Sequence, residues 1–347
     1  MSIYAELLEE ALVYERSAVA AGDLAGSVVE KEVHGRRYLY WQLRMGDRSV
    51  QRYIGSDSPA LRADLERRSQ RRGDLASDQE ALARLAAMLL AAGLPREEVR
   101  VSAALRLLAD LGLFRRGGVL VGTQAYRAYG PLLGHRLPAA SLRTQDIDVA
   151  LELSVAIAAA EEPAPALASE LHGLGFLPIP GLDPSQPSTS FKIRGRELRV
   201  DFLTPATGRA RERPVIVPGI GLAAWPLPLL DYLIEEPTPA VILASKPILV
   251  RLPRPARFAL HKLWTAARRS VAEAAKSGKD RLQAAALIEI LAADRPDDLV
   301  ADWRALGRRS PRAQGRVARE LARIPEDQRR AWPRPLRAIR RSAGSRV

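Results

Sequence analysis

Apolar residues recur every three or four positions over several stretches of the chain, which is the period of an amphipathic helix. This spacing predicts helices over residues 3–21, 59–72, 77–92 and 96–113. Ser77 and Glu80 have the form of a capping box, which marks the start of the third of these helices. Residues 27–54 instead alternate apolar and polar side chains around a turn at residues 45–47, so we expect a small antiparallel meander there.

Short apolar runs between turn residues replace the helical period after residue 118. They predict strands over residues 119–121, 145–153, 190–193 and 197–203, with a helix over residues 124–133 after the first strand. Residues 205–239 are rich in Pro and Gly, and the apolar part over residues 219–228 is expected to be packed loop. Short strands are predicted near 241–243 and 248–252. Helices are predicted over 255–276 and 279–293, and the remaining chain is expected to be helical with proline interruptions.

Length and composition are those of a globular protein of one to three domains. The 347 residues are 47% apolar, and the changes of pattern predict domains over residues 1–75, 76–252 and 253–347. The absence of cysteine excludes disulfides, thiolate metal sites and cysteine nucleophiles. We expect a cytoplasmic protein with no membrane partner, because no apolar run approaches the ~18 residues that span a bilayer and the first residues do not resemble a secretory signal.

Most of the net positive charge lies near the end of the chain. The formal net charge is +13, and residues 301–347 contain 14 arginines and four acidic residues. A basic segment of this kind is typical of proteins that bind RNA, DNA or another polyanion, and also of a solvated Arg-rich surface. The charge pattern alone leaves both interpretations open.

Three aspartates form the most informative chemical pattern. Asp146 and Asp148 are two residues apart on one predicted strand, so their side chains point to the same face. Asp201 lies on a later strand and joins that face if the two strands are neighbours. Like charges gathered this way favour a divalent cation between them, and Mg²⁺ prefers oxygen ligands. Three such carboxylates can hold two Mg²⁺ ions for phosphoryl or nucleotidyl transfer.

A possible phosphate-binding turn precedes the aspartates. Gly122 and Thr123 connect a short buried strand to a helix, and a glycine there lets backbone amides approach a phosphate group at the helix start. The Thr123 hydroxyl can donate to the same phosphate. The alternative is an ordinary helix start with Thr123 as its N-cap.

The order of these motifs resembles the nucleotidyltransferase superfamily of DNA polymerase β. It consists of an apolar strand, Gly122-Thr123, a helix, Asp146-Ile147-Asp148 and a later lone Asp201. The surrounding sequence, including His261-Lys262-Leu263, is similar to bacterial nucleotidyltransferase-like proteins related to abortive-infection nucleotidyltransferase toxins. The resemblance covers about residues 30–295 and implies an α+β fold: a small mixed sheet flanked by helices, with an N-terminal antiparallel meander and a helical C-terminal region.

The resemblance also implies roles for individual residues. Asp146, Asp148 and Asp201 would be the catalytic residues that bind two Mg²⁺ ions, and Gly122 and Thr123 would hold the phosphates of a nucleoside triphosphate. Lys262, and secondarily Lys279, lie where related enzymes place basic residues on the triphosphate. Lys279-Asp280 has a second interpretation as a helix start. Lys192 is a further candidate, because its hairpin carries Asp201.

Three functional hypotheses follow. The first is an Mg²⁺-dependent transferase that moves a nucleoside monophosphate from a nucleoside triphosphate to a hydroxyl group of an RNA or protein acceptor, with RNA favoured by the basic tail. The second is an inactive fold of the same kind that binds nucleic acid. The third, suggested by family analogy alone, is a component of a toxin–antitoxin or phage-defence pair.

Overall fold

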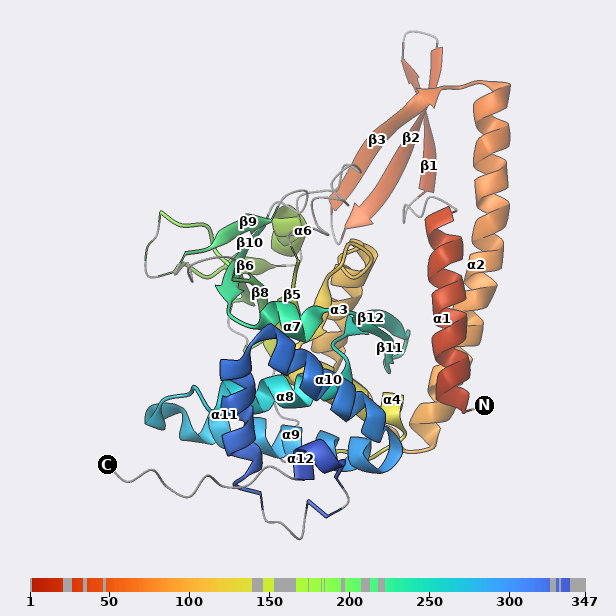
Figure 1. Ribbon diagram of the computed structural model, residues 1–347. Coiled ribbons are helices and arrows are strands. Elements are labelled where there is room, and N and C mark those ends of the chain that lie inside the picture. The colour runs from red at the N-terminus through yellow and green to blue at the C-terminus, as the bar shows by residue number, and fades with distance from the viewer. Residues whose placement is uncertain are drawn as a thin grey trace. The chain divides into compact units, whose positions relative to one another are not determined.

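A computed structural model of the 347-residue chain gives the fold (Figure 1). The structure describes residues 2–20, 27–33, 36–45, 48–138, 146–152, 167–173, 175–181, 183, 185–194, 197–206, 213–217, 222–324, 329–330 and 332–337. Backbone contacts separate two compact units, Met1–Glu97 with Leu243–Leu249 and Glu98–Ile242 with Val250–Val347. Each unit is described by itself.

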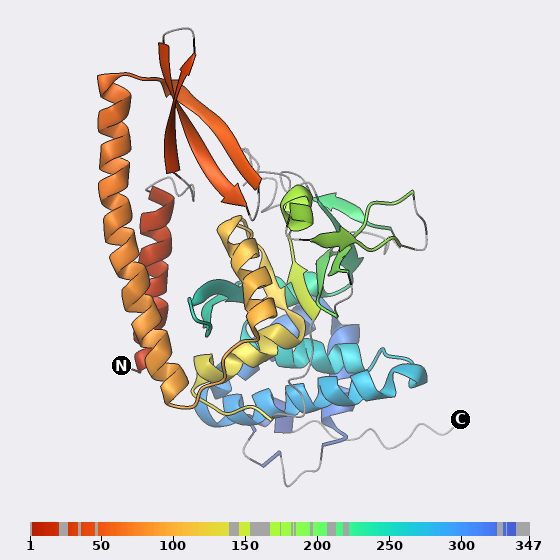
Figure 2. The same cartoon turned by 180° about the vertical axis from the view of Figure 1, so that it is seen from behind.

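The first unit consists of two helices and an antiparallel sheet. Helix α1 (Ile3–Ala20) packs along the 33-residue helix α2 (Pro59–Ala91), as Figures 1 and 2 both show. Strands β1 (Ser27–Val33), β2 (Arg36–Met45) and β3 (Arg48–Ser56) form the expected meander in the order β1-β2-β3. The Ser58 hydroxyl caps α2 by accepting a hydrogen bond from the amide of Leu61, 3.2 Å away.

The predicted break between residues 72 and 77 is wrong, because α2 is continuous. A glycine inside a helix costs about 1 kcal/mol relative to alanine, so Gly73 alone does not end it. Leu75 lies within the expected break and Leu82 lies after it, and both are buried, which indicates that packing overrides the local signals. The predicted domain boundary between residues 75 and 76 lies inside this helix.

The second unit is built on a mixed sheet, which confirms the expected α+β fold class. The sheet has the path β4-β5-β8-β10-β9, and β7 pairs with both β8 and β6. Its strands are β4 (Val119–Val121), β5 (Asp146–Ala150), β6 (Phe176–Pro178), β7 (Ser190–Ile193), β8 (Arg199–Pro205), β9 (Val215–Val217) and β10 (Leu222–Leu227). Strands β11 (Thr238–Ile242) and β12 (Ile248–Leu252) form a separate pair.

The expectation of packed loop over residues 219–228 is wrong for residues 222–227, which form β10. The surrounding Pro- and Gly-rich stretch also supplies β9 and helix α7 (Leu230–Ile234). Strand β10 runs parallel to β8 even though it contains Pro226, which cannot donate a backbone hydrogen bond. Ala223 and Ala224 of β10 are buried. Burial of an apolar strand therefore decides the structure here despite the proline.

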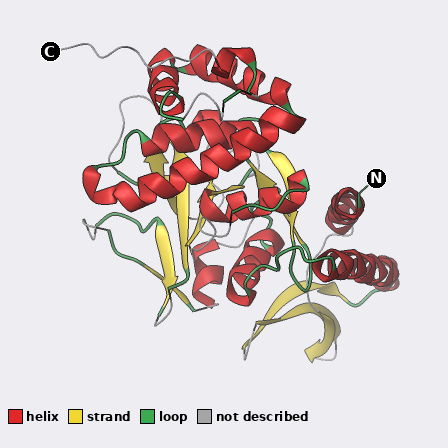
Figure 3. Cartoon of the chain, turned by 90° about the horizontal axis from the view of Figure 1, so that it is seen from below, coloured by secondary structure: helices red, strands yellow, loops and turns green. Residues whose placement is uncertain are grey.

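Helices surround this sheet, and those of the C-terminal region form a layer beside the strands (Figure 3). The helices are α3 (Val99–Asp110), α4 (Gly122–Leu133), α6 (Leu167–Gly173), α8 (Pro255–Ala266), α9 (Ala274–Asp294), α10 (Pro296–Arg309), α11 (Pro311–Leu321) and α12 (Arg334–Arg337), with a 3₁₀ turn at Val271–Glu273. The single helix predicted over 255–276 therefore ends ten residues earlier.

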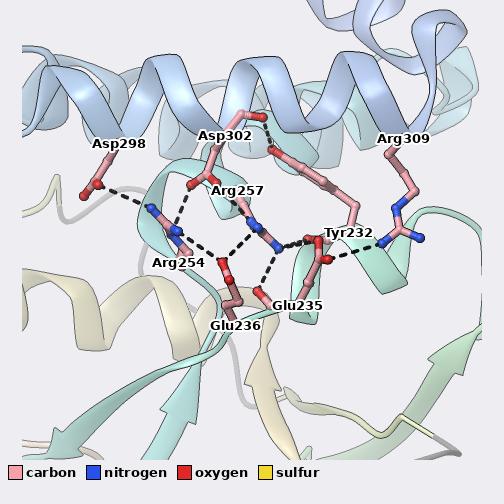
Figure 4. Close-up of polar contacts among 8 residues, drawn as sticks. All are labelled: Tyr232, Glu235, Glu236, Arg254, Arg257, Asp298, Asp302 and Arg309. Carbon is pink, nitrogen blue, oxygen red and sulfur yellow. Dashed lines mark hydrogen bonds and ion pairs between the residues drawn. The ribbon is translucent and has the colours of Figure 1, made fainter.

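A buried network of charged groups fastens α10 to α7 and α8 (Figure 4). The Arg257 guanidinium donates from Nε to Oδ1 of Asp302 over 3.0 Å, and both side chains are almost fully buried. Arg257 also donates to the backbone oxygen of Glu235 over 2.8 Å, and the Tyr232 hydroxyl donates to the backbone oxygen of Asp302 over 3.0 Å. These bonds satisfy polar groups that would otherwise be costly to bury.

Candidate active site

The turn at Gly122 lies directly against one of the aspartates. Gly122 follows β4 at the start of α4 and has a φ of +67°, a conformation that glycine adopts without strain. A Cβ atom at this position would lie only 2.1 Å from Oδ2 of Asp148. Glycine is therefore required both by the backbone conformation and by the approach of the carboxylate.

Thr123 is not the N-cap of α4. The capping position is Val121, and the structure shows no side-chain hydrogen bond to the first turn there. This excludes the alternative interpretation of Thr123 as an ordinary cap. Thr123 is buried, at 9% exposure, within the first turn of the helix.

Strands β5 and β8 are parallel neighbours, as the expected gathering of the carboxylates requires. Their register places Asp148 directly opposite Asp201 and Asp146 opposite Arg199. Strand β4 pairs with the other edge of β5, with Val121 opposite Asp148. The turn and the aspartates are thus held together by the hydrogen-bonded ladder of three strands.

The opposite faces of β5 and β8 explain why this arrangement is rigid. Ile147, Val149, Val200 and Phe202 alternate with the aspartates and are fully buried on the other face. A slip of one residue would expose this core and bury the charges. The register therefore follows from the apolar residues, and the positions of the carboxylates follow from the register.

Asp201 is engaged by two groups that sequence reasoning missed. Its Oδ1 accepts hydrogen bonds from Oγ of Ser190 over 2.5 Å and from Nε of Arg199 over 2.6 Å. Arg199 precedes Asp201 by two residues on the same strand, so the strand period could have placed both on one face. Ser190 lies opposite Asp201 on β7, a register that the sequence does not reveal.

The carboxylates do not form a ready three-ligand cluster in this conformation. Within the residues that the structure describes, no group of three or more His, Cys, Asp or Glu side chains is placed to hold one metal ion. Asp201 would have to exchange its contacts with Ser190 and Arg199 for such a ligand role.

Asp148 is the aspartate whose proton affinity changes most clearly. Burial raises its pKa to about 7, and the neighbouring charges of Asp201 and Asp146 act in the same direction. The positive charges of Lys262 and Arg199 lower it in part. A carboxylate that is destabilised by burial and by like charges gains from any cation that enters beside it.

Lys262 is held in place by a buried acid. Its Nζ donates to Oδ1 of Asp280 over 2.8 Å, and Nε of Arg269 donates to Oδ2 of the same carboxylate over 2.8 Å. The side chain of Asp280 is only 4% exposed. The link therefore joins α8 to α9 and orients a lysine whose charge lowers the pKa of Asp148.

The remaining candidate lysines occupy different environments. Lys279 lies within α9, which begins at Ala274, so it does not start a helix. Its pKa is lowered overall, because burial and the charge of Lys262 outweigh the opposite effect of the nearby aspartates, including Asp146 and Asp148. Lys192 lies opposite Arg199 on β7, which places it on the sheet face of Asp201 with its side chain exposed.

Comparison with known proteins agrees with this geometry. A protein-family model described as nucleotidyltransferase matches residues 99–307, which is more than half of the chain. No curated protein and no solved structure gives a significant match. The matched segment contains every candidate residue named above. Within the described residues, no helix is both long and apolar enough to cross a membrane.

Proposed function

Because this chain belongs to the nucleotidyltransferase family, we propose that it transfers a nucleoside monophosphate from a nucleoside triphosphate to a hydroxyl group, with Mg²⁺ as cofactor. The observation that supports this proposal most is the pairing of Asp148 with Asp201 across parallel strands, directly beside the Gly122 turn. The family implies a nucleotide substrate. The metal dependence, the donor and the acceptor belong to the proposal.

The residues present fit Mg²⁺ by their chemistry. Asp146, Asp148 and Asp201 offer oxygen ligands alone, which suit this hard cation, and a cation would offset the burial and the like charges that raise the pKa of Asp148. When bound, Mg²⁺ neutralises phosphate charge and polarises the reacting phosphoryl group. In this proposal Asp201 leaves Arg199, which then faces the phosphates as an additional positive charge.

The other residues position the donor. The amides at the start of α4 beside Gly122 and the hydroxyl of Thr123 bind terminal phosphate oxygens, and Lys262 neutralises charge on the same group. Asp280 keeps Lys262 from pairing with Asp148, because its Oδ1 holds Nζ of Lys262 at a distance of 2.8 Å. Lys192 and Lys279 supply further positive charge at the rim.

The transfer itself needs little covalent chemistry from the protein. The oxygen of the acceptor hydroxyl attacks the α-phosphorus, the bond to the leaving pyrophosphate breaks, and the hydroxyl proton passes to a carboxylate oxygen of Asp201. Catalysis then consists mainly of alignment and charge neutralisation.

The direct test uses nucleoside triphosphates labelled at the α-phosphate. The purified protein is incubated with each of them, Mg²⁺ and a cell lysate, and the labelled product is digested with nuclease or protease to identify the acceptor class. We expect Asp148→Asn and Asp201→Asn to lower the labelling rate at least 100-fold. Asp297→Asn is the matched control, because Asp297 is exposed on α10, and it should retain full activity.

Two outcomes would contradict the proposal. One is labelling that persists in both site variants, which would place the chemistry elsewhere. The other is a folded wild-type protein that labels nothing with any triphosphate and binds none in the presence of Mg²⁺. The second outcome would favour the inactive, nucleic-acid-binding alternative.

A further inference from the structure

A pocket of about 380 Å³ lies between the end of α8 and one face of α11. Its lining consists of four arginines, one glutamate and one alanine: Arg268, Arg316, Arg319, Arg323, Glu320 and Ala267. Arg316 and Arg319 are three residues apart on α11, so they project from the same side of the helix, and Arg323 follows the end of that helix. None of these residues belongs to the candidate active site.

The single carboxylate of the pocket is already neutralised. Glu320 is buried and accepts from Nε of Arg281 over 2.6 Å, and Nη1 of Arg323 lies 2.9 Å from its other oxygen. Among the described residues, no acidic side chain pairs with Arg316, Arg319 or Arg268. The pocket therefore presents several uncompensated guanidinium groups, and a concave surface focuses their field.

Helix stabilisation accounts for only part of this arrangement. Cations near a helix C-terminus interact favourably with the helix dipole, which explains Arg268 after α8 and Arg323 after α11. Arg316 lies in the middle of α11, where this effect has faded. Its charge, exposed and beside like charges, gains from an anionic ligand and from nothing else in the described structure.

The form of the pocket favours a strand with several phosphates over a single small anion. Arg316 and Arg323 are seven residues apart, which corresponds to about 10 Å at the rise of a helix. This separation is larger than the distance that a single phosphate group can bridge. Guanidinium groups bind phosphate oxygens through paired, directional hydrogen bonds. Arg268 also lies over the ring of Trp264, 4.5 Å from its centre, which holds the guanidinium plane on an aromatic surface.

We infer that this pocket binds the phosphodiester backbone of a single-stranded nucleic acid. The contacts go to phosphates, so the site reads no base sequence. It extends the function of the chain beyond the transfer centre, because it gives the C-terminal region a defined nucleic-acid contact in place of a diffuse positive surface.

The test measures binding of a fluorescent 20-nucleotide RNA to the full chain by anisotropy, between 50 and 200 mM salt and in EDTA, which prevents any Mg²⁺-dependent reaction. We expect Arg316→Ala with Arg319→Ala to weaken binding about tenfold. The slope of log K against log salt should fall by about 1.4, the value for two lost phosphate contacts with a single strand. Both side chains are exposed, so thermal melting should show an unchanged fold.

The matched control is Arg304→Ala with Arg308→Ala. These arginines are four residues apart and exposed on α10, and their removal changes the net charge by the same amount. This pair should change RNA affinity less than twofold. An equal loss in both double variants would overturn the inference in favour of nonspecific attraction.

Two further results separate this site from other possibilities. Direct binding of inorganic pyrophosphate that depends on Arg316, with no binding of RNA, would identify a small-anion site and overturn the inference. Asp148→Asn should bind RNA like the wild type. If RNA binding survives in that variant while nucleotidyl transfer fails in the wild type, the pocket stands and the proposed reaction falls.

Discussion

Gly122 and Asp148 show how closely the geometry of the candidate active site depends on single atoms. The glycine is needed because its Cβ would lie 2.1 Å from the Asp148 carboxylate, and Asp148 is destabilised because it is buried beside Asp201. The two residues meet through the pairing of Val121 with Asp148. A change at either residue should therefore alter the site without altering the fold.

Substitution of Gly122 by alanine should abolish activity. The methyl group would displace Asp148, and the positive φ adds about 1–2 kcal/mol of strain. Gly134→Ala is the control, because Gly134 also has a positive φ of +72° but nothing lies within 4 Å of its Cβ position. We expect both variants to lose similar stability in urea unfolding, whereas only Gly122→Ala loses nucleotidyl transfer, by at least 100-fold. Equal activity of the two would show that the close approach is irrelevant.

The raised pKa of Asp148 predicts a pH-dependent stability. The unfolded carboxyl has a pKa near 3.8 and the folded one a pKa of about 7, so the folded state binds the proton more tightly. This contribution to stability is complete below the unfolded pKa and is lost as the pH rises through 7.

Asp148→Asn removes this titration. In EDTA, the unfolding free energy of the variant relative to that of the wild type should rise by about 2 kcal/mol between pH 5 and pH 8. This is less than the full pKa shift of Asp148 would give, because the carboxyl is partly accessible to solvent. Unfolding curves at the two pH values provide the measurement. A difference between the two proteins that is independent of pH would mean that Asp148 titrates normally.

At the scale of elements, the register of β5 and β8 brings the separate aspartates of the sequence together at the candidate site. The sequence predicts both strands and the shared face of Asp146 and Asp148, because the strand period is local. It could not predict that Asp148 faces Asp201, or that Ser190 and Arg199 hold Asp201, because strand pairing depends on contacts between distant residues. The same limit explains why β10 was expected to be a loop.

The prediction of helix boundaries from the sequence was wrong for a related reason. Gly73 and the Ser77 capping pattern are local stop and start signals, but α2 continues through them, and Leu75 between the two signals and Leu82 after them are both buried. Conversely, the sequence at Lys279-Asp280 is compatible with a helix start, but both residues lie inside α9. Asp280 is buried there by its bonds to Lys262 and Arg269.

The buried network between α7, α8 and α10 makes a prediction about stability. Asp302→Ala should lower the unfolding free energy by about 3 kcal/mol, because it removes the buried carboxylate partner of Arg257 and leaves its guanidinium only the more exposed Glu235 and Glu236. Asp298→Ala, one turn earlier on α10, removes a more exposed ion pair with Arg254 and should cost less than about 1 kcal/mol. Chemical denaturation distinguishes the two, and similar costs would show that the network contributes little.

At the scale of the whole molecule, composition located an excess of charge without assigning it a role. The excess of arginine over acidic residues in 301–347 is compatible with a polyanion partner and with a solvated surface, and it identifies no site. The structure concentrates part of that charge in the pocket formed by α8 and α11. Residues 338–347 of the basic tail lie outside the described structure, so the wider role predicted for it stays a prediction.

The family and the predicted motifs agree over the same part of the chain. The family match spans residues 99–307, and the resemblance seen in the sequence extended over about 30–295. The N-terminal meander lies outside the matched segment, so its contribution to function is not implied by the family. All the residues of the proposed transfer centre lie in the second unit.

The measurement that tests the central claim most directly is anomalous diffraction from crystals grown with Mn²⁺, in place of Mg²⁺, and a non-hydrolysable nucleoside triphosphate analogue. We predict anomalous peaks at the carboxylates of Asp146, Asp148 and Asp201, with the Asp201 side chain turned away from Arg199 and the phosphates against the Gly122 turn. A nucleotide bound elsewhere, or Asp201 still paired with Arg199 and no metal beside Asp148, would contradict the account.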